Sequence, residues 1–208
     1  MEPVSIAQLV FYAIALIALG LPLGLYMARV YSAEGGAVTR RLGLGALERG
    51  FYRVVRTHAA REQDWKSYAK SVVIFTAVFS LVLYALLRLQ SHLFLNPDGL
   101  PGVPSHISLN TTASFVTNTN WQYYGGEYTM SYLSQMAGLA VQNFVSAAIG
   151  MAVLVAVIRG FARRSASTVG NFWVDLYRSL VYILLPLAFI LAAILVTQGV
   201  VQTFDGKA

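Results

Sequence analysis

The residues of this sequence best suited to bind an ion form one uncharged polar segment, Val116-Thr117-Asn118-Thr119-Asn120. It has no carboxylate, imidazole or thiol, so the usual side-chain ligands of a transition metal are missing from it. Its chemistry is a row of main-chain carbonyl oxygens with two threonine hydroxyls beside them. A ring of such oxygens can replace the water around an alkali cation. The segment is therefore a candidate potassium site, with Thr117, Asn118 and Thr119 as the K⁺ ligands.

The order of residues in this segment supports that hypothesis. Potassium filters have the reference sequence T-V-G-Y-G, and aligning residues 116–120 on it puts asparagine at both glycine positions. Glycine is used there because successive carbonyls face one axis only if some residues adopt left-handed dihedrals. Asparagine is the non-glycine residue that best tolerates this region. We expect Trp121 and Tyr123 to support the strand from behind.

Two simpler interpretations of the segment stay open on composition. A series of Ser, Thr and Asn is typical of an ordinary external loop. Asn110-Thr111-Thr112 also matches a glycosylation acceptor, which is a common chance match. The position of the segment, between two apolar stretches, favours a pore loop over an external loop, and the lack of any other secretory feature argues against glycosylation. Non-helical backbone at membrane depth is tolerated only where protein buries it or where it lines a water-filled cavity.

The elements that would position this loop are membrane spans. The chain of 208 residues is 57% hydrophobic and 12% charged, against about 25% charged in a soluble domain. With no cysteine, it is neither a disulfide-stapled domain nor a structural zinc fold. Crossing a bilayer takes about 20 apolar helical residues. Four charge-free runs meet this length, at residues 3–28, 71–87, 128–158 and 179–204. The sequence predicts an all-α membrane protein.

The basic residues predict the orientation of these spans. Nine of the 15 Lys and Arg residues lie between residues 29 and 70, and four more lie between 159 and 178. The positive-inside rule places both connections in the cytoplasm and the N-terminus outside. The net charge of +6 is then a topology signal, and we expect a lipid bilayer and no nucleic acid as partner.

We expect the following organisation, in which a short helix at residues 108–115 points its C-terminal partial negative charge at the cation. It consists of an extra N-terminal transmembrane helix (1–30), a basic cytoplasmic loop with an amphipathic helix (31–69), a first span–pore loop–span repeat (70–160, pore loop 108–123), a cytoplasmic connection (161–179), the first helix of a second repeat (180–204) and a truncated external loop (205–208). The amphipathic helix suits anionic lipid headgroups or a partner subunit.

Five strings of the sequence are similar to one known family. The string V-T-N-T-N-W-Q at residues 116–122 is the most specific of them, and the others lie at residues 65–68, 109–115, 131–144 and 163–176. They resemble the potassium-binding A subunit (KdpA) of the bacterial Kdp potassium-transporting P-type ATPase. The resemblance implies a potassium-channel-like fold of span–pore loop–span repeats. It implies a filter strand at residues 117–120, with Gln122 near the pore mouth.

The resemblance also implies partners and a location. A separate catalytic P-type ATPase subunit would hydrolyse ATP, since this chain has no glycine-rich phosphate loop and no D-K-T-G string. Accessory small and C subunits would complete the complex in the bacterial plasma membrane, and K⁺ would be the transported substrate. The family has four pore loops, whereas this chain has one, so we expect a fragment rather than a four-copy assembly or a non-functional product. The alternative function is a structural or lipid-binding helical membrane protein.

Overall fold

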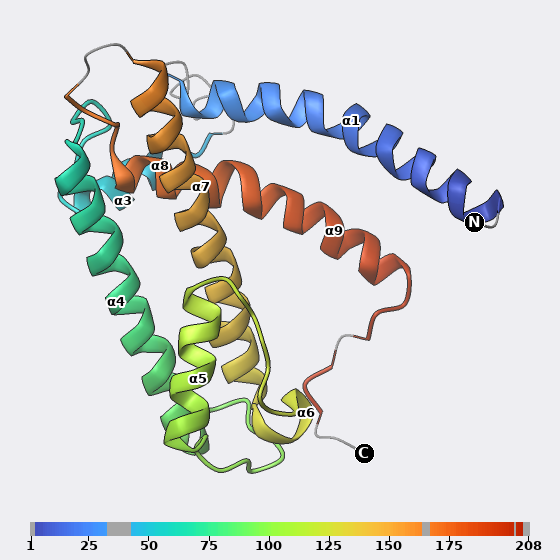
Figure 1. Cartoon of the computed structure of the whole chain (residues 1–208). Helices are drawn as coiled ribbons and strands as arrows, with labels where there is room; N and C mark the ends of the chain where they lie inside the picture. Colours follow the sequence, from blue (N-terminus) through green and yellow to red (C-terminus); the bar gives the residue numbers. More distant parts are fainter. Residues whose placement is uncertain (1–2, 33–42, 164–166, 202, 206–208) are drawn as a thin grey trace. The chain divides into compact units, whose positions relative to one another are not determined.

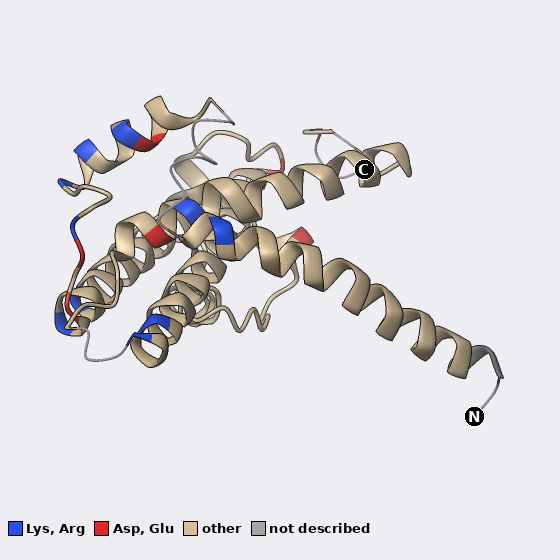
Figure 2. Cartoon of the chain, turned by 90° about the horizontal axis from the view of Figure 1, so that it is seen from above, with Lys and Arg blue, Asp and Glu red and all other residues tan. Residues whose placement is uncertain are grey.

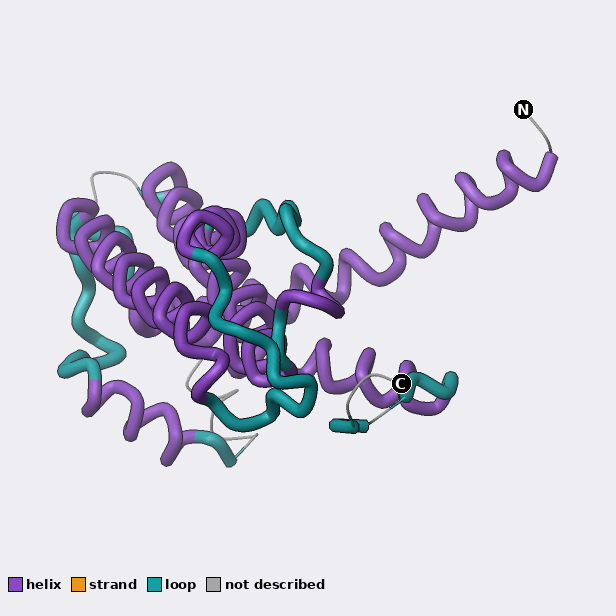
Figure 3. The backbone as a smooth tube through the Cα atoms, turned by 90° about the horizontal axis from the view of Figure 1, so that it is seen from below, coloured by secondary structure: helices purple, strands orange, loops and turns teal. Residues whose placement is uncertain are grey.

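The computed structural model describes residues 3–32, 43–163, 167–201 and 203–205, and over these it contains helices and loops without a β-strand (Figures 1 and 3). Parts of the predicted connections and of the predicted external end, residues 33–42, 164–166 and 206–208, lie outside the described residues. The helices are α1 (Pro3–Tyr31), α3 (Gly45–Val54), α4 (Trp65–Leu89), the 3₁₀ turn η1 (Gln90–His92), α5 (Ser105–Val116), α6 (Gly126–Thr129), the π-helical η2 (Ser134–Ala140), α7 (Val141–Ala162), α8 (Phe172–Arg178), the π-helical η3 (Ser179–Leu184) and α9 (Leu185–Thr197).

The chain divides into two units, Met1–Arg56 and Thr57–Ala208. The first contains α1, whose apolar side chains are largely exposed, with Phe11 74% accessible. It also contains the short helix α3, in which the Tyr52 hydroxyl donates to Glu48 Oε1 one turn away at 2.5 Å. The predicted amphipathic pattern therefore forms a helix, with Leu47 and Val54 exposed.

Four helices are long and apolar enough to cross a membrane. They cover Ile6–Tyr31, Trp65–His92, Ser134–Ala162 and Phe172–Thr197. Most of their apolar side chains face outward, which suits a lipid environment and would be costly in water. The prediction of an all-α membrane protein is confirmed, and the chain is a multi-pass membrane protein.

The last of these helices begins earlier than its charge-free run. The run starts at Ser179, but the helix begins at Phe172 and includes two charged residues, Asp175 and Arg178. The side chain of Asn171 caps its first turn by accepting from the amides of Trp173 and Val174. Asp175 is accommodated because Arg159 of α7 donates to its carboxylate through two nitrogens, at 2.6 and 2.9 Å. A buried charge that has a partner does not end a helix.

Inside the second unit, α4 and α7 lie side by side, and α5 lies along part of their length (Figure 1). Two apolar clusters hold them together. One joins α4, α7 and α8 through Tyr68, Ala148, Ala152, Ala156, Phe172 and Leu176, and the other surrounds α5 through Leu83, Leu87, Val103, Phe115, Met130 and Leu139. The small alanines of α7 let the neighbouring helices approach closely, as is usual between membrane helices.

The basic end of this unit is tied together by polar contacts. Lys and Arg residues gather where α4 begins and α7 ends (Figure 2). Asp64 caps α4 by accepting from the amide of Ser67 at 2.9 Å, and this hydrogen bond lowers the pKa of Asp64. Hydrogen bonds from Arg163 and Thr168 likewise lower the pKa of Glu62. The segment before α4 and the segment before α8 are thus held against each other.

Candidate ion-binding loop

The segment between α4 and η2 begins and ends beside the C-terminal end of α4. The side-chain amide of Gln90 donates to the carbonyl of Pro101 at 2.6 Å and to that of Thr129 at 2.8 Å. Its Oε1 accepts from the amide of Ser131 and the hydroxyl of Ser134. Gln90 is fully buried, so losing any of these bonds would leave a polar group unpaired. One side chain therefore fixes both ends of the loop.

Between these ends, α5 runs inward along α4 and α7. It begins at Ser105, after Pro104, and ends at Val116, which is longer than the predicted 108–115. Gly102 permits a close approach at its entry, because a Cβ there would lie 2.5 Å from the carbonyl oxygen of Arg88. The side chains that α5 buries are mostly small and polar, namely Ser108, Thr111, Thr112, Ser114 and Phe115. Small side chains allow a polar helix to pack tightly between two apolar ones.

The backbone turns sharply at the loop tip, which we define as residues 117–120. All four amides of the loop tip donate to carbonyls of the last turn of α5. Thr117 donates to Ala113, Asn118 to Phe115, and both Thr119 and Asn120 to Ser114, at 3.0–3.3 Å. The hydroxyls of Thr117 and Thr119 lie 2.8 Å apart. The N–H groups of the loop tip are therefore turned toward the helix from which it emerges.

The carbonyls of the same stretch are left available. Within the described residues, the carbonyl oxygens of residues 116–119 accept no hydrogen bond. Asn118 and Asn120 both have φ of 57°, while the threonines beside them have ordinary negative φ. These are the two positions where the sequence has asparagine in place of glycine. With φ alternating in sign, the amides of the loop tip point back to the carbonyls at the end of α5, while the carbonyl oxygens of residues 116–119 are left without a hydrogen bond from the described residues.

A long-range hydrogen bond fixes the depth of the loop tip. The hydroxyl of Ser146 shares its proton between the carbonyl of Gln142, one turn earlier, at 2.8 Å and Asn118 Oδ1 at 3.1 Å. Ser146 lies in the helix Ser134–Ala162, 12 residues from its start, which is about 18 Å along the axis. The 12 residues of α5 also span about 18 Å. Two independent lengths thus place the loop tip well inside the length of the adjacent helices.

The predicted site residues lie together in this turn. Val116 is the last residue of α5 and is half-buried, while Thr117, Asn118, Thr119 and Asn120 are exposed. Gln122 is exposed as well. Trp121 contacts α5 as expected, since its indole N–H donates to Asn110 Oδ1 at 2.8 Å, but Tyr123 is 69% exposed.

Sequence reasoning missed three residues that position this turn, namely Gln90, Ser114 and Ser146. A glutamine and two serines in helical stretches have no local signal, because their partners lie in distant parts of the chain. The hydroxyl of Ser114 donates to the carbonyl of Trp121 at 2.9 Å, so it closes the turn from below. Within the described part of the chain, no three His, Asp or Glu side chains group together as metal ligands.

These features define a class of protein. It is a polytopic α-helical membrane protein in which a half-length helix folds back between two full-length helices and presents unpaired carbonyls at its C-terminal end. A family model described as the potassium-transporting ATPase A subunit, KdpA, matches residues 10–208. The chain belongs to this family.

Curated relatives agree along nearly the whole chain. A protein of Sorangium cellulosum is 58% identical over 199 residues, which cover 96% of this chain and 34% of the relative. One from Solidesulfovibrio magneticus is 54% identical over 207 residues, covering 100% of this chain and 35% of the relative. One from Bordetella pertussis is 60% identical over 159 residues, which cover 76% of this chain and 27% of the relative. Each is named a potassium-transporting ATPase potassium-binding subunit, and this chain spans about a third of the length of the first two.

Proposed function

We propose that residues 116–120 form one strand of a potassium selectivity filter, in a potassium-binding subunit of an ATP-driven importer. The observation that carries this proposal is the row of unpaired carbonyl oxygens at residues 116–119, held at depth by the hydrogen bond from Ser146 to Asn118. Oxygens without a protein partner are free to replace the water of an ion. The names of the relatives supply the ion and the process.

The loop stabilises a cation without a formal charge. The C-terminus of α5 carries a partial negative charge of about half an electron, and it ends directly at the loop tip. Thr117, Asn118 and Thr119 contribute carbonyl oxygens, and the linked threonine hydroxyls hold the spacing between two of them. Gln122, just beyond the turn, would lie at the pore mouth. Neutral ligands bind K⁺ weakly enough to release it, which transport requires.

One strand cannot surround an ion, so the proposal includes further strands. Filters of this type use four loops. Because the relatives are about three times as long as this chain, we propose that it is the N-terminal portion of a subunit with four filter strands. The exposure of Thr117, Asn118, Thr119 and Asn120 suits a strand whose neighbours lie in the remainder of such a subunit.

The partners and topology follow from the same proposal. ATP hydrolysis would take place on a separate catalytic P-type subunit, with the small and C subunits as accessories. The basic connections would face the cytoplasm of a bacterium and the N-terminus would lie outside, with the filter open to the external side. The segment boundaries predicted from the sequence, with residues 70–160 as the first repeat, remain part of this proposal.

A chimera tests the filter. This chain would replace the matching first third of the Sorangium relative, and uptake of K⁺ and Na⁺ would be measured in cells that carry the other subunits. Asn118→Asp adds a negative charge at the loop tip, and we expect it to reduce the K⁺ over Na⁺ discrimination by at least about tenfold, or about 1.4 kcal/mol. The control is Gln198→Glu, which adds a charge at the exposed end of α9. Equal selectivity in both variants would contradict the proposal.

Cysteine labelling tests the depth of the loop in the chain itself. The chain has no cysteine, so single cysteines at residues 114–123 can be labelled without a background. With an impermeant reagent added from outside, we expect labelling to slow toward the loop tip and to recover at Tyr123. Rapid and uniform labelling along the segment would favour the alternative, a structural or lipid-binding membrane protein with an ordinary external loop.

A further inference from the structure

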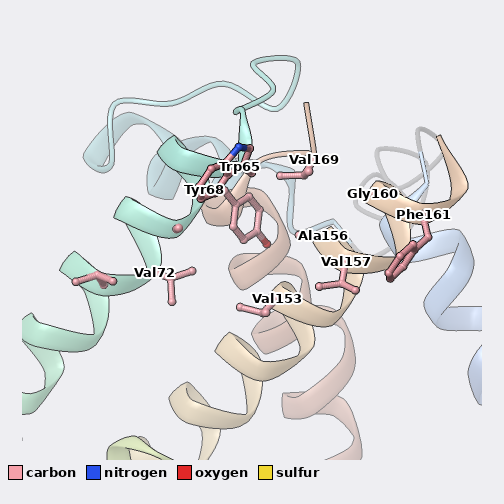
Figure 4. Close-up of a pocket in the computed structure, with 11 residues that line it drawn as sticks. Trp65, Tyr68, Val72, Val153, Ala156, Val157, Gly160, Phe161 and Val169 are labelled. Carbon is pink, nitrogen blue, oxygen red and sulfur yellow. The ribbon is translucent and has the colours of Figure 1, made fainter. Parts of the chain in front are cut away.

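An apolar groove runs between α4 and α7 at the basic end of the second unit, far along α7 from the ion-binding loop. It has a volume of about 520 Å³. Two helical stretches, residues 65–73 and 153–161, form its walls, and Val169 closes its end (Figure 4). Tyr68 and Ala156 form the buried floor, whereas Trp65, Val73 and Phe161 are more than half exposed at the rim. The groove therefore opens outward, toward the space that a bilayer fills.

Gly160 of α7 lines the groove and leaves open space beside it. A Cβ added at Gly160 would meet no atom within 4 Å, so nothing in the protein requires glycine to avoid a clash at this point of α7. A larger side chain there would project into the groove and fill it. The hydroxyl of Tyr68 does not provide a polar group for an occupant, since it donates to the carbonyl of Ala152 at 2.7 Å. The surface that remains is apolar.

Positive charge lies at the rim of this groove. Lys66 and Lys70 are exposed on the first turns of α4, next to Ala69 and Val73, and neither forms an ion pair within the described residues. The Lys66 ammonium lies over the ring of Trp65, 5.7 Å from its centroid. The two arginines nearby are occupied, because Arg159 pairs with Asp175 and Arg163 with Glu62. In the described part of the chain, the two lysines form no ion pair of this kind, although Lys66 interacts electrostatically with Asp64 just before α4, and they are the cations that an occupant could contact.

We propose that this groove is a binding site for an anionic phospholipid, with an acyl chain between α4 and α7 and the phosphate on Lys66 and Lys70. An anionic headgroup complements the two lysines, and Trp65 is the residue type that prefers the headgroup level. The length of the groove also favours a lipid. Nine residues of each helix extend about 12 Å, whereas a transmembrane helix would need a contact surface along about 30 Å.

Fluorescence quenching by brominated phospholipids tests the site. The whole chain, with Trp121→Phe and Trp173→Phe so that Trp65 is the only one of the three tryptophans left, is placed in phosphatidylcholine vesicles. A tenth of the lipid is then replaced by phosphatidylglycerol or phosphatidylcholine brominated in the chain. We expect phosphatidylglycerol to be preferred at Trp65 by between about fivefold and about 25-fold, since one lysine at a membrane surface contributes about fivefold and the site has two.

Three variants assign the preference to the groove. The double variant Lys66→Gln with Lys70→Gln should abolish the preference for phosphatidylglycerol over phosphatidylcholine. Gly160→Leu should abolish it as well, by filling the groove. Gly150→Leu is the matched control, because Gly150 is also an exposed glycine of α7 with no atom near its Cβ, and it does not line the groove. It should keep the preference, with circular dichroism confirming that each variant is folded.

Each contrary result identifies a different error. Equal quenching by both lipids in the unmodified groove would mean ordinary bilayer contact and would overturn the proposal. Absence of quenching by either lipid would mean that a protein segment covers the groove, and it would overturn the proposal as well. Loss of the preference in Gly150→Leu would show that the site is not this groove.

Discussion

Breaking the ion pair between Arg159 and Asp175 on one side should cause a large loss of stability. The Asp175 side chain is 1% exposed and accepts from both terminal nitrogens of Arg159. The Tyr68 hydroxyl oxygen lies 3.2 Å from it, although the shorter contact of that hydroxyl is with the carbonyl of Ala152. In Asp175→Leu the guanidinium, only 16% exposed, loses its counter-ion. Breaking a buried pair on one side costs about 3–5 kcal/mol.

A second ion pair of the described residues provides the internal control. Arg163, the C-cap residue of α7 four positions after Arg159, donates to Glu62 at 2.8 Å, but the side chains are 38% and 40% exposed. Exposed pairs contribute between zero and about 1 kcal/mol. Glu62→Gln therefore removes the same type of interaction, at the same end of the same helix, where water can compensate for the loss.

The measurement is unfolding in mixed micelles as the SDS fraction rises, followed by circular dichroism and by tryptophan fluorescence. We expect Asp175→Leu to lower the free energy of unfolding by about 3–5 kcal/mol and Glu62→Gln by less than about 1 kcal/mol. The double variant Arg159→Met with Asp175→Leu should regain most of the loss, because it removes the unpaired charge. A loss in Asp175→Leu no larger than that in Glu62→Gln, or a double variant with additive losses, would refute the reasoning.

Three further outcomes follow from the structure. Gly170→Ala should lower the free energy of unfolding by at least about 2 kcal/mol, since φ is +107° and the new Cβ would lie 2.1 Å from a guanidinium nitrogen of Arg159. Gly150→Ala has open space around the new Cβ and should raise the free energy of unfolding by about 0.5–1 kcal/mol. Because the pKa of Glu62 is lowered in the folded chain, its contribution to the free energy of unfolding is present above the usual carboxyl pKa and is lost as the pH falls. The free energy of unfolding should therefore drop by less than about 1 kcal/mol between about pH 5 and pH 3, and this drop should be absent in Glu62→Gln. Ser146→Ala should speed hydrogen exchange at the loop-tip amides by about fivefold in mass spectrometry, whereas Ser80→Ala, whose hydroxyl bonds only within α4, should leave them unchanged.

Much of the fold was predictable because membrane spans have a strong compositional signal. Each of the four charge-free runs lies largely within one of the four long apolar helices. The boundaries were less predictable where a charge was compensated by a distant partner. Asp175 interrupts the apolar pattern in the sequence, and only the position of Arg159, 16 residues earlier, makes it acceptable inside a helix. Patterns along the chain do not contain that information.

At the loop tip, too, the local backbone conformation was predictable from the sequence and the long-range contacts were not. Two asparagines in glycine positions predicted left-handed backbone, and both have it, because the preference belongs to the residue itself. The contacts that hold the turn depend instead on Gln90 and Ser146, which are ordinary polar residues until the fold brings them to their partners. Local conformation was therefore accessible from the sequence, and the anchoring was not. The function of the loop as a filter strand remains a prediction.

The π-helical turn η2 explains how one helix can anchor the loop at two depths. Ser134 binds Gln90 at the entry of the loop, and Ser146 binds Asn118 at its tip. In a regular α-helix these serines, 12 residues apart, would differ in direction by about 120°. A π-helical turn between them absorbs about one residue, which rotates everything after it by about 100° and brings both serines onto nearly the same face. The π-helical turn η2 therefore lets the helix Ser134–Ala162 contact the loop both at its entry, through Ser134, and at its tip, through Ser146.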